Sequence, residues 1–256
     1  MAGMTLPAAR RHYDVLCAAF APPLPAGMKR VDDRIGSVPV RRHRPAHCRP
    51  GTVVYAHGGG FSLGSLDSHQ GIAVGLAQAL GREVLAIGYR LLPEARYADA
   101  LDDCRRVIDA VAPAALVGDS AGGRLILDAV AGARRVPPLG LVYPLVGVPT
   151  AATLGPDAPL LSRRDALDAW SLIAQDAPGG GGPRPPATAI EVLAVSRDPL
   201  TAPLERAVAV WREGGADVGY HLADDMLHGC LHAQVSLPGM AVAWRAFCRA
   251  LGNRLG

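Results

Sequence analysis

One serine lies among glycines in the segment GDSAGG, residues 118–123. A serine hydroxyl becomes a useful nucleophile only when a neighbouring base removes its proton. The apolar run before this segment predicts a strand and the residues after it predict a helix, so the G-x-S-x-G pattern stands at a sharp strand-to-helix turn. There the serine lies at a helix N-terminus, where developing negative charge is stabilised. Ser120 is therefore the candidate nucleophile, and a tight turn with an incidental serine is the alternative.

A run of glycines lies upstream in YAHGGGF, residues 55–61. The backbone N–H groups of glycines are unobstructed and can point at a carbonyl oxygen that gains negative charge during acyl transfer. One such donor lowers the barrier by about 3–4 kcal/mol. A flexible turn is the alternative, but it does not account for the flanking His57 and Phe61 or for the serine turn downstream. We interpret the run as a candidate oxyanion loop.

The base and its orienting acid are chosen by position among eight histidines and many acids. His228, in DMLHGCLH, follows the last predicted strand, and Asp198, in AVSRDPLTA, follows the predicted strand over 189–195. The carboxyl ends of parallel strands meet at one edge of a sheet, so both residues are expected beside Ser120. A carboxylate holds the imidazole of such a base in the correct tautomer. The chain order Ser, Asp, His is the order that this type of serine turn requires.

Other acids are weaker candidates for the partner of His228. Two lie in the loop of the histidine itself and would have to fold back, one stands beside Ser120 and is expected to point away from the base, and two lie in a predicted helix. These are, in that order, Asp224, Asp225, Asp119, Asp102 and Asp103. The segment HGCLH also brings His228, Cys230 and His232 close together. The two histidines are four residues apart and can share a helical face, but no third strong metal ligand is evident. Packing is therefore expected here, and no metal.

Short apolar runs alternate with longer helical patterns along the chain, which predicts an α/β fold. Strands are predicted at 52–56, 83–88, 114–118, 140–144, 189–195 and 217–222, and helices at 68–80, 97–112, 121–133, 203–214 and 238–251. This alternation is typical of a mostly parallel sheet with helices on both faces. The segment SVPVRRH is predicted to add an antiparallel edge strand, and a helix before it is expected to lie over the end of the sheet.

Two segments stand outside this alternation, residues 1 to about 45 and residues 145–187. The second holds a helical pattern, SRRDALDAWSLIAQ, followed by the loop PGGGGPRPP. The strand pattern resumes directly after that loop, so we interpret it as an insertion and not as a linker between domains. Residues 1–256 are predicted to form a single domain, in which both segments cover a pocket as a small cap.

The composition argues against several classes of partner. The net charge is +3, and the only short basic run, RRHR at 41–44, is interpreted as a solvated strand end and not as a nucleic-acid contact. No apolar run reaches the roughly 18 residues of a membrane span. Asp14 and three prolines interrupt the weakly signal-like N-terminus. Five cysteines without a CxxC pattern predict reduced thiols and a cytoplasmic location.

Four motifs in order, HGGGF, GDSAGG, DPL and HG, resemble the hormone-sensitive-lipase-like (bacterial family IV type) esterases of the α/β-hydrolase fold. YRLLPEARYADALDDC at 89–104 is similar to a further segment of that family, and the resemblance runs from Val53 to His232. It implies Ser120 as nucleophile, His228 as base and Asp198 as its partner. For the remaining site residues it implies Gly59, Gly60 and Ala121 as backbone oxyanion donors, Gly58 as the residue that shapes the loop, and His57 and Glu94 as supporting residues.

The sequence departs from the family pattern at several positions. Leu92 replaces the usual alanine, Arg124 the usual asparagine and Cys230 the usual phenylalanine. Arg124 and Cys230 are expected to act in packing, with a change in the pocket wall as the alternative. The region from Tyr143 to the strand at 189 is short, and the family's SPL segment is missing. These departures affect the expected substrate more than the expected mechanism.

The sequence therefore predicts a serine carboxylesterase that hydrolyses small, short-chain acyl esters through an acyl-enzyme intermediate, without a metal or an organic cofactor. The nearest alternative is an amidase-type hydrolase such as an arylformamidase. A non-catalytic ligand receptor on the same scaffold is another, although receptors of this kind lose the base and His228 is present. A homodimer through an edge strand or the final helix is left open.

Overall fold

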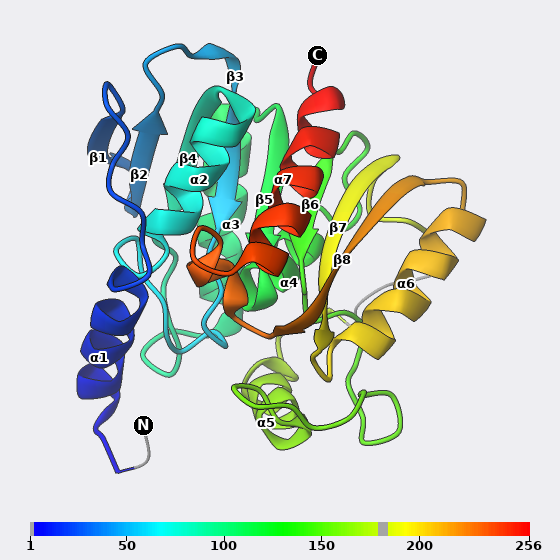
Figure 1. The fold of residues 1–256 in the computed structure, drawn as a ribbon. Coiled ribbons are helices and arrows are strands. Elements are labelled where there is room, and N and C mark those ends of the chain that lie inside the picture. The colour runs from blue at the N-terminus through cyan, green and yellow to red at the C-terminus, as the bar shows by residue number, and fades with distance from the viewer. Residues whose placement is uncertain (1–2, 179–183) are drawn as a thin grey trace.

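The computed structural model describes residues 3–178 and 184–256, and within them eight strands form one sheet in the order β1-β2-β4-β3-β5-β6-β7-β8 (Figure 1). The strands are β1 (Lys29–Ile35), β2 (Val38–Arg44), β3 (Arg49–Ala56), β4 (Arg82–Ile87), β5 (Ala115–Asp119), β6 (Leu139–Val142), β7 (Ala189–Arg197) and β8 (Asp217–Leu227). From β4 across to β8 all neighbours are parallel. The predicted α/β class is confirmed.

The antiparallel strand predicted in SVPVRRH is β2, but it is not the edge of the sheet. β1 pairs with it on the outside, from Lys29 opposite Arg44 to Ile35 opposite Val38, and β2 pairs antiparallel with β4 on its other side. β1 reads KRVDDRI, and six of its seven residues are exposed. An exposed strand shows no alternation of apolar and polar residues, so the sequence pattern did not reveal it.

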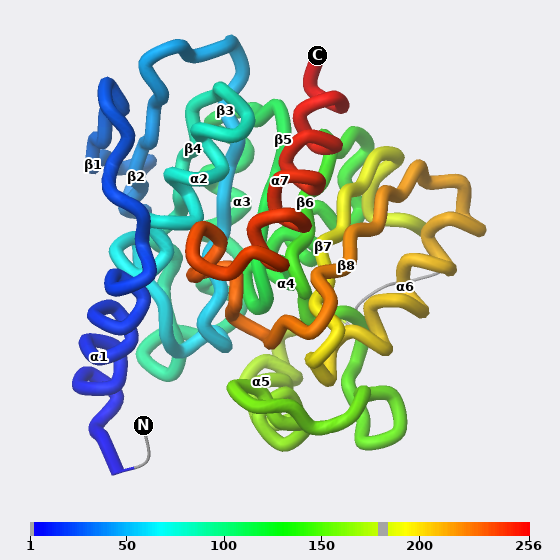
Figure 2. The backbone as a smooth tube through the Cα atoms, in the orientation of Figure 1, coloured from blue at the N-terminus to red at the C-terminus, as the bar shows by residue number. Residues whose placement is uncertain are grey.

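Helices cover both faces of the sheet (Figure 2). The helices are α1 (Leu6–Ala18), α2 (Gln70–Leu80), α3 (Tyr97–Val111), α4 (Ser120–Ala129), α5 (Arg163–Ile173), α6 (Thr201–Glu213) and α7 (Pro238–Asn253), with a short 3-10 turn η1 (Cys230–Ala233). Successive strand residues face opposite sides. Val54 and Ala56 pack in the core with α3, α4 and α6, whereas Val53 and Tyr55 pack in the core with α2 and α7.

Two helices lie beyond the sheet, at the end where the parallel strands terminate (Figure 1). α1 precedes the sheet, as expected for a helix that lies over its end. α5 begins in a capping box, in which the hydroxyl of Ser162 accepts from the N–H of Asp165 and the carboxylate of Asp165 accepts from the N–H of Ser162. The predicted loop PGGGGPRPP falls partly on residues 179–183, which lie outside the described residues.

Candidate active site

Ser120 lies at the junction of β5 and α4 with a φ angle of 50°, a left-handed conformation that is strained for a residue with a side chain. Its neighbours are glycines because the backbone packs too closely for a side chain. A Cβ on Gly122 would lie 2.1 Å from the carbonyl oxygen of Ala56, and one on Gly118 would lie 2.6 Å from the carbonyl carbon of Gly122. The turn therefore lifts the hydroxyl of Ser120 above the end of the sheet.

The serine, the histidine and the aspartate chosen from the sequence form one chain of hydrogen bonds. Oγ of Ser120 lies 2.8 Å from Nε2 of His228, and Nδ1 of His228 lies 2.7 Å from Oδ2 of Asp198. Because a carboxylate only accepts, Nδ1 carries the proton and the unprotonated Nε2 accepts from the serine hydroxyl. This is the protonation state in which the imidazole can act as a base.

Asp198 is held in place from several directions. Its side chain is fully buried, and its second oxygen, Oδ1, accepts from the N–H of Leu200 at 2.8 Å. Two of the other candidate acids pair elsewhere, Asp225 with Arg197 and Asp103 with Arg90. Among the acids considered, the structure therefore brings Asp198 to the imidazole.

The glycine loop lies beside Ser120 with its backbone in unusual conformations. Gly59 and Gly60 have φ angles of +112° and +59°, and a Cβ on Gly59 would lie 2.3 Å from the carbonyl oxygen of Leu63. Within the described residues, no hydrogen bond is formed by the N–H groups of Gly59, Gly60 or Ala121. All three residues line the same cavity as Ser120. They are thus available to a negatively charged oxygen.

Asp119 supports this loop, a role that the sequence analysis did not assign. Its Oδ1 accepts from the N–H of Gly58 at 3.0 Å and from the hydroxyl of Tyr55 at 2.5 Å. Burial raises the pKa of Asp119, but the neighbouring His69 and the hydrogen bond from Tyr55 outweigh it and lower the pKa to about 2. The N–H of Gly58 thus donates to a buried carboxylate, which shapes the loop, and the N–H groups of the next two glycines stay unpaired in the described residues.

His57 also supports the loop and is not in a position to act as a base. It is buried and stacks on Tyr89, with ring centroids 4.2 Å apart, and its Nδ1 donates to the carbonyl of Gly58 at 2.8 Å. Burial, with the nearby His69, lowers the pKa of His57 to about 3, so the ring is neutral near pH 7.

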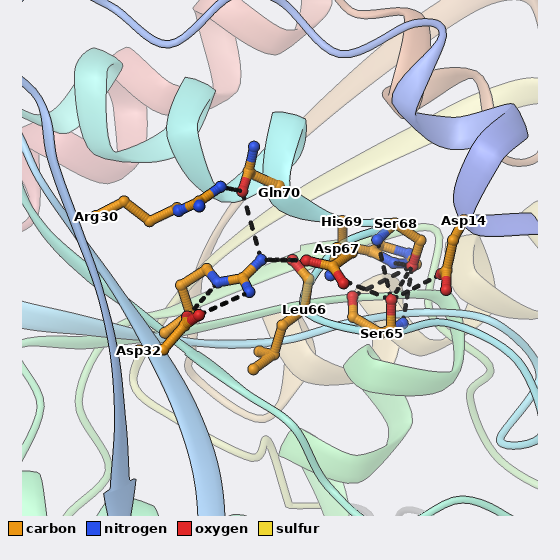
Figure 3. Close-up of polar contacts among 10 residues, drawn as sticks. Asp14, Arg30, Asp32, Ser65, Leu66, Asp67, Ser68, His69 and Gln70 are labelled. Atoms are coloured by element: carbon orange, nitrogen blue, oxygen red, sulfur yellow. Dashed lines mark hydrogen bonds and ion pairs between the residues drawn. The ribbon is translucent and has the colours of Figure 1, made fainter. Parts of the chain in front are cut away.

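The segment that follows the glycine loop is fixed by a polar network, shown in Figure 3. The hydroxyl of Ser65 donates to Asp14 on α1 at 2.7 Å and accepts from the N–H of Ser68 at 3.0 Å. Asp67 accepts from Arg41 of β2 at 2.6 Å, and Arg41 also pairs with Asp32 of β1. The strand pair β1–β2 thereby helps to hold this segment.

Helix α1 is fastened over the same loop through Arg10. The guanidinium donates to the carbonyls of Ser62 and Leu92, at 2.8 and 2.9 Å, and pairs with Glu94 at 2.7 Å. Glu94, expected to be a supporting residue, therefore acts through α1. From that helix Tyr13 reaches the cavity.

The cavity in front of Ser120 has a volume of about 520 Å³. Its walls come from the glycine loop, α1, η1 and α5. The lining residues contributed by α5 and the residues before it include Leu160, Leu161, Asp165, Ala169 and Leu172. A largely apolar cavity of this size with a few polar groups in its wall is typical of a site for a small organic molecule.

The segment HGCLH does not assemble a metal site. His232 lies in η1, where its Nε2 is 3.2 Å from the hydroxyl of Tyr13 and 3.6 Å from the sulfur of Cys17. In residues 3–178 and 184–256 no group of three or more histidine, cysteine, aspartate or glutamate side chains is placed to hold a metal ion. Over the same residues, no helix is long and apolar enough to cross a membrane.

Comparison with known proteins adds an independent line of evidence. A profile described as the alpha/beta hydrolase fold matches residues 53–232. The chain is 40% identical to an ethyl acetate hydrolase of Pseudomonas putida over 104 residues, 35% of this chain and 33% of that enzyme. It is 35% identical to the carboxylesterase NlhH of Mycobacterium tuberculosis over 161 residues, 54% of this chain and 50% of that enzyme. The matched part therefore spans half or less of these relatives.

A solved structure has the same fold as this chain. An esterase from the bacterial hormone-sensitive lipase family superimposes with a TM-score of 0.84 and 22% identity, over 100% of this chain and 94% of the other. The predicted fold and family resemblance are confirmed. Because the family profile matches more than half of the sequence, the chain belongs to the α/β-hydrolase family.

Proposed function

We propose that this protein is a serine carboxylesterase that hydrolyses small, short-chain acyl esters. The observation that supports it best is the hydrogen-bonded series Ser120–His228–Asp198, with 2.8 Å from Oγ to Nε2 and 2.7 Å from Nδ1 to Oδ2. Ser120 and His228 line the same cavity as Gly59, Gly60 and Ala121, whose backbone N–H groups are free in the described residues. The named activities of the two matched relatives, on ethyl acetate and on carboxylic esters, agree with it.

The reaction follows from this geometry. Nε2 of His228 takes the proton of Ser120 while Oγ attacks the ester carbonyl, and a tetrahedral intermediate forms. The N–H groups of Gly59, Gly60 and Ala121 then donate to the oxyanion. His228 passes its proton to the leaving alcohol, and an acyl-serine remains. Water, deprotonated by the same imidazole, attacks the acyl carbonyl, and the imidazolium returns the proton to Oγ of Ser120 as the bond to the acyl group breaks and the acid is released.

The role of Asp198 in this scheme is to orient the base. Its carboxylate accepts from Nδ1 of His228, fixes the tautomer and stabilises the imidazolium that forms in each half-reaction. The buried position of Asp198 strengthens this interaction because little water screens it.

We further propose that residues 1 to about 45 and 145–187 act as a small cap on one catalytic domain. The cavity takes lining residues from both segments, Tyr13 from the first and Leu160 and Leu172 from the second. Leu160 and Leu172 are 76% and 50% exposed, which suits side chains that would be covered by a bound acyl or alcohol group. A cytoplasmic location is also proposed, since all five cysteines are free thiols.

Labelling with a fluorophosphonate probe tests the proposal. The probe forms a covalent bond only with an activated serine, so the protein is expected to take up one label at Ser120, found by peptide mass spectrometry. Hydrolysis of p-nitrophenyl butyrate and of N-formylkynurenine is measured on the same sample. An unlabelled protein would support a ligand receptor instead, and faster turnover of the formamide would support an amidase.

A further inference from the structure

Arg124 is the largest side chain that the structure buries almost completely, at 1% exposure. It lies on α4, four residues and therefore about one helical turn after Ser120. A guanidinium remains charged at all ordinary pH values, and burying it is costly unless every part of it finds a partner. The hydrogen-bond partners of its guanidinium therefore indicate the structural role of Arg124.

One edge of the guanidinium is neutralised within the same helix. Nε of Arg124 donates to Oδ2 of Asp128 at 2.7 Å, and the same oxygen accepts from the hydroxyl of Tyr97 at 2.6 Å. This pair balances the charge and fixes the direction of the side chain. The two remaining nitrogens are thereby aimed away from α4.

Those nitrogens bond to two carbonyls that are distant in sequence. Nη1 donates to the carbonyl of Gly147 at 2.7 Å, and Nη2 donates to the carbonyl of Pro178 at 2.6 Å. Gly147 precedes the segment that carries α5 and Pro178 follows that helix. The ring of Trp170, within α5, lies over the guanidinium at 5.0 Å from its centre. Arg124 therefore holds this segment at both ends and in the middle.

Helix α5 presents different faces to Arg124 and to the cavity. Trp170 and Ile173, three residues apart, pack against the core that contains α4. Asp165, Ala169 and Leu172, at the i, i+4, i+7 spacing of one helical face, line the cavity in front of Ser120. A shift of α5 relative to α4 would therefore move this wall of the cavity relative to the nucleophile.

We propose that Arg124 is a positioning residue that fixes the α5 wall of the ester-binding cavity relative to Ser120 and so sets which chain lengths the enzyme prefers. This inference rests on the proposed esterase function. The role requires an arginine, because a planar fork can reach a carboxylate and two carbonyls while stacking on an aromatic ring. The point charge of a lysine cannot do all of these at once.

The test compares Arg124→Lys and Trp170→Leu with the parent on p-nitrophenyl acetate, butyrate, hexanoate and octanoate. We expect the ratio of kcat/KM between the best and worst esters to fall by about tenfold, the size of effect that a change in pocket fit produces, and KM of the best ester to rise. Arg105→Lys is the matched control. Arg105 is exposed and, within the described residues, its side chain donates only to the carbonyl of Asp128, so its variant should keep the parent profile.

Trypsin provides a second readout that needs no esterase activity. In the Arg124→Lys variant, cleavage after Arg163 and Arg164, at the start of α5, should become about tenfold faster, because cleavage follows local opening of the segment. The Arg105→Lys variant should be cleaved at the parent rate. If the parent hydrolyses no ester, the proposed function fails, but this assay still tests the role of Arg124.

Two outcomes would overturn the inference. One is an Arg124→Lys variant with an unchanged chain-length profile and an unchanged cleavage rate. The other is a variant that loses kcat equally on every ester with KM unchanged, which would mean that Arg124 contributes only to the amount of folded protein.

Discussion

The proposed reactivity of Ser120 rests on a short series of hydrogen bonds. The hydroxyl is aligned on Nε2 of His228 at 2.8 Å, and the imidazole is aligned by a carboxylate at 2.7 Å. Tyr143 packs against the same imidazole, with ring centroids 4.5 Å apart, so the ring has little room to turn away. Both hydrogen-bond distances lie within the reach that general-base catalysis requires.

Replacing Asp198 by asparagine should disturb the tautomer of the His228 imidazole while leaving the fold intact. An amide at this position can donate to Nδ1 of His228 and so favours the tautomer in which Nε2 holds the proton and cannot serve as base. We expect kcat on p-nitrophenyl butyrate to fall by about 10⁴-fold. Asp225→Asn is the matched control, because Asp225 lies three residues before the base and is exposed. An Asp198→Asn variant with kcat close to that of the parent would exclude Asp198 as the orienting acid.

The sequence was sufficient to select Ser120, His228 and Asp198, because each follows the end of a predicted parallel strand and such ends meet at one edge of the sheet. It was not sufficient for Asp119, whose partners are Tyr55 and Gly58, or for Arg124, whose partners include Gly147 and Pro178. These contacts join segments that are distant in sequence. Periodicity describes one segment at a time and does not report which carbonyl or hydroxyl another segment brings nearby.

Helix α4 lies very close to the sheet at the site. At Gly122 the helix lies against the end of β3, where an added Cβ would meet the carbonyl oxygens of Ala56 at 2.1 Å and His57 at 2.5 Å. This close approach sets the distance between the helix N-terminus and the glycine loop. The N–H groups proposed to donate to the oxyanion, at Gly59 in the loop and at Ala121 in α4, depend on this distance.

The substitution Gly122→Ala should therefore destabilise the protein and lower its activity. Making room for the methyl group requires α4 to move away from β3, at a cost of about 1–3 kcal/mol or more in the free energy of unfolding. Gly252→Ala is the control: its helix, α7, leaves ordinary van der Waals space of 3.6 Å to Leu80, so a gain of up to about 1 kcal/mol is expected. Urea unfolding measures both. Equal stability of Gly122→Ala and the parent would show that the close approach is not required.

The elements themselves were largely predictable where they are buried. The strand over 189–195 is found as Ala189–Arg197 because its apolar run is continuous and buried on both faces. The final helix over 238–251 is found as Pro238–Asn253 because its buried residues repeat with the helical period. β1 was missed because its pairing with β2 is stabilised mainly by backbone bonds and by charged pairs such as Arg42 with Asp33. Such a strand leaves no apolar signature.

The whole molecule buries neutral imidazoles, and this couples its stability to pH. His43 and His57 are 0% and 2% exposed, and burial lowers the pKa of His43 to about 4 and the pKa of His57 to about 3. In the unfolded chain both titrate near pH 6.5. Unfolding below that pH therefore takes up protons, so the contribution of both rings is fully present above pH 6.5 and is lost progressively as the pH falls.

The free energy of unfolding should accordingly decrease on acidification by up to about 1.4 kcal/mol per pH unit for each of these histidines, most steeply near pH 5, which lies between the pKa in the unfolded chain and the pKa in the folded protein. Urea unfolding as a function of pH measures the slope. His43→Leu should lower this slope by the contribution of one proton taken up on unfolding. His47→Gln should leave the slope unchanged, because His47 is exposed. The same slope in the parent and in His43→Leu would show that His43 is not held neutral by the fold.

Hydrolysis of p-nitrophenyl butyrate by the parent and by Ser120→Ala tests the central claim most directly. The methyl group of alanine fits the turn but offers no nucleophile, so kcat should fall by at least about 10⁴-fold while the urea midpoint stays close to that of the parent. Full activity in a folded Ser120→Ala variant would contradict the assignment of Ser120 as the nucleophile.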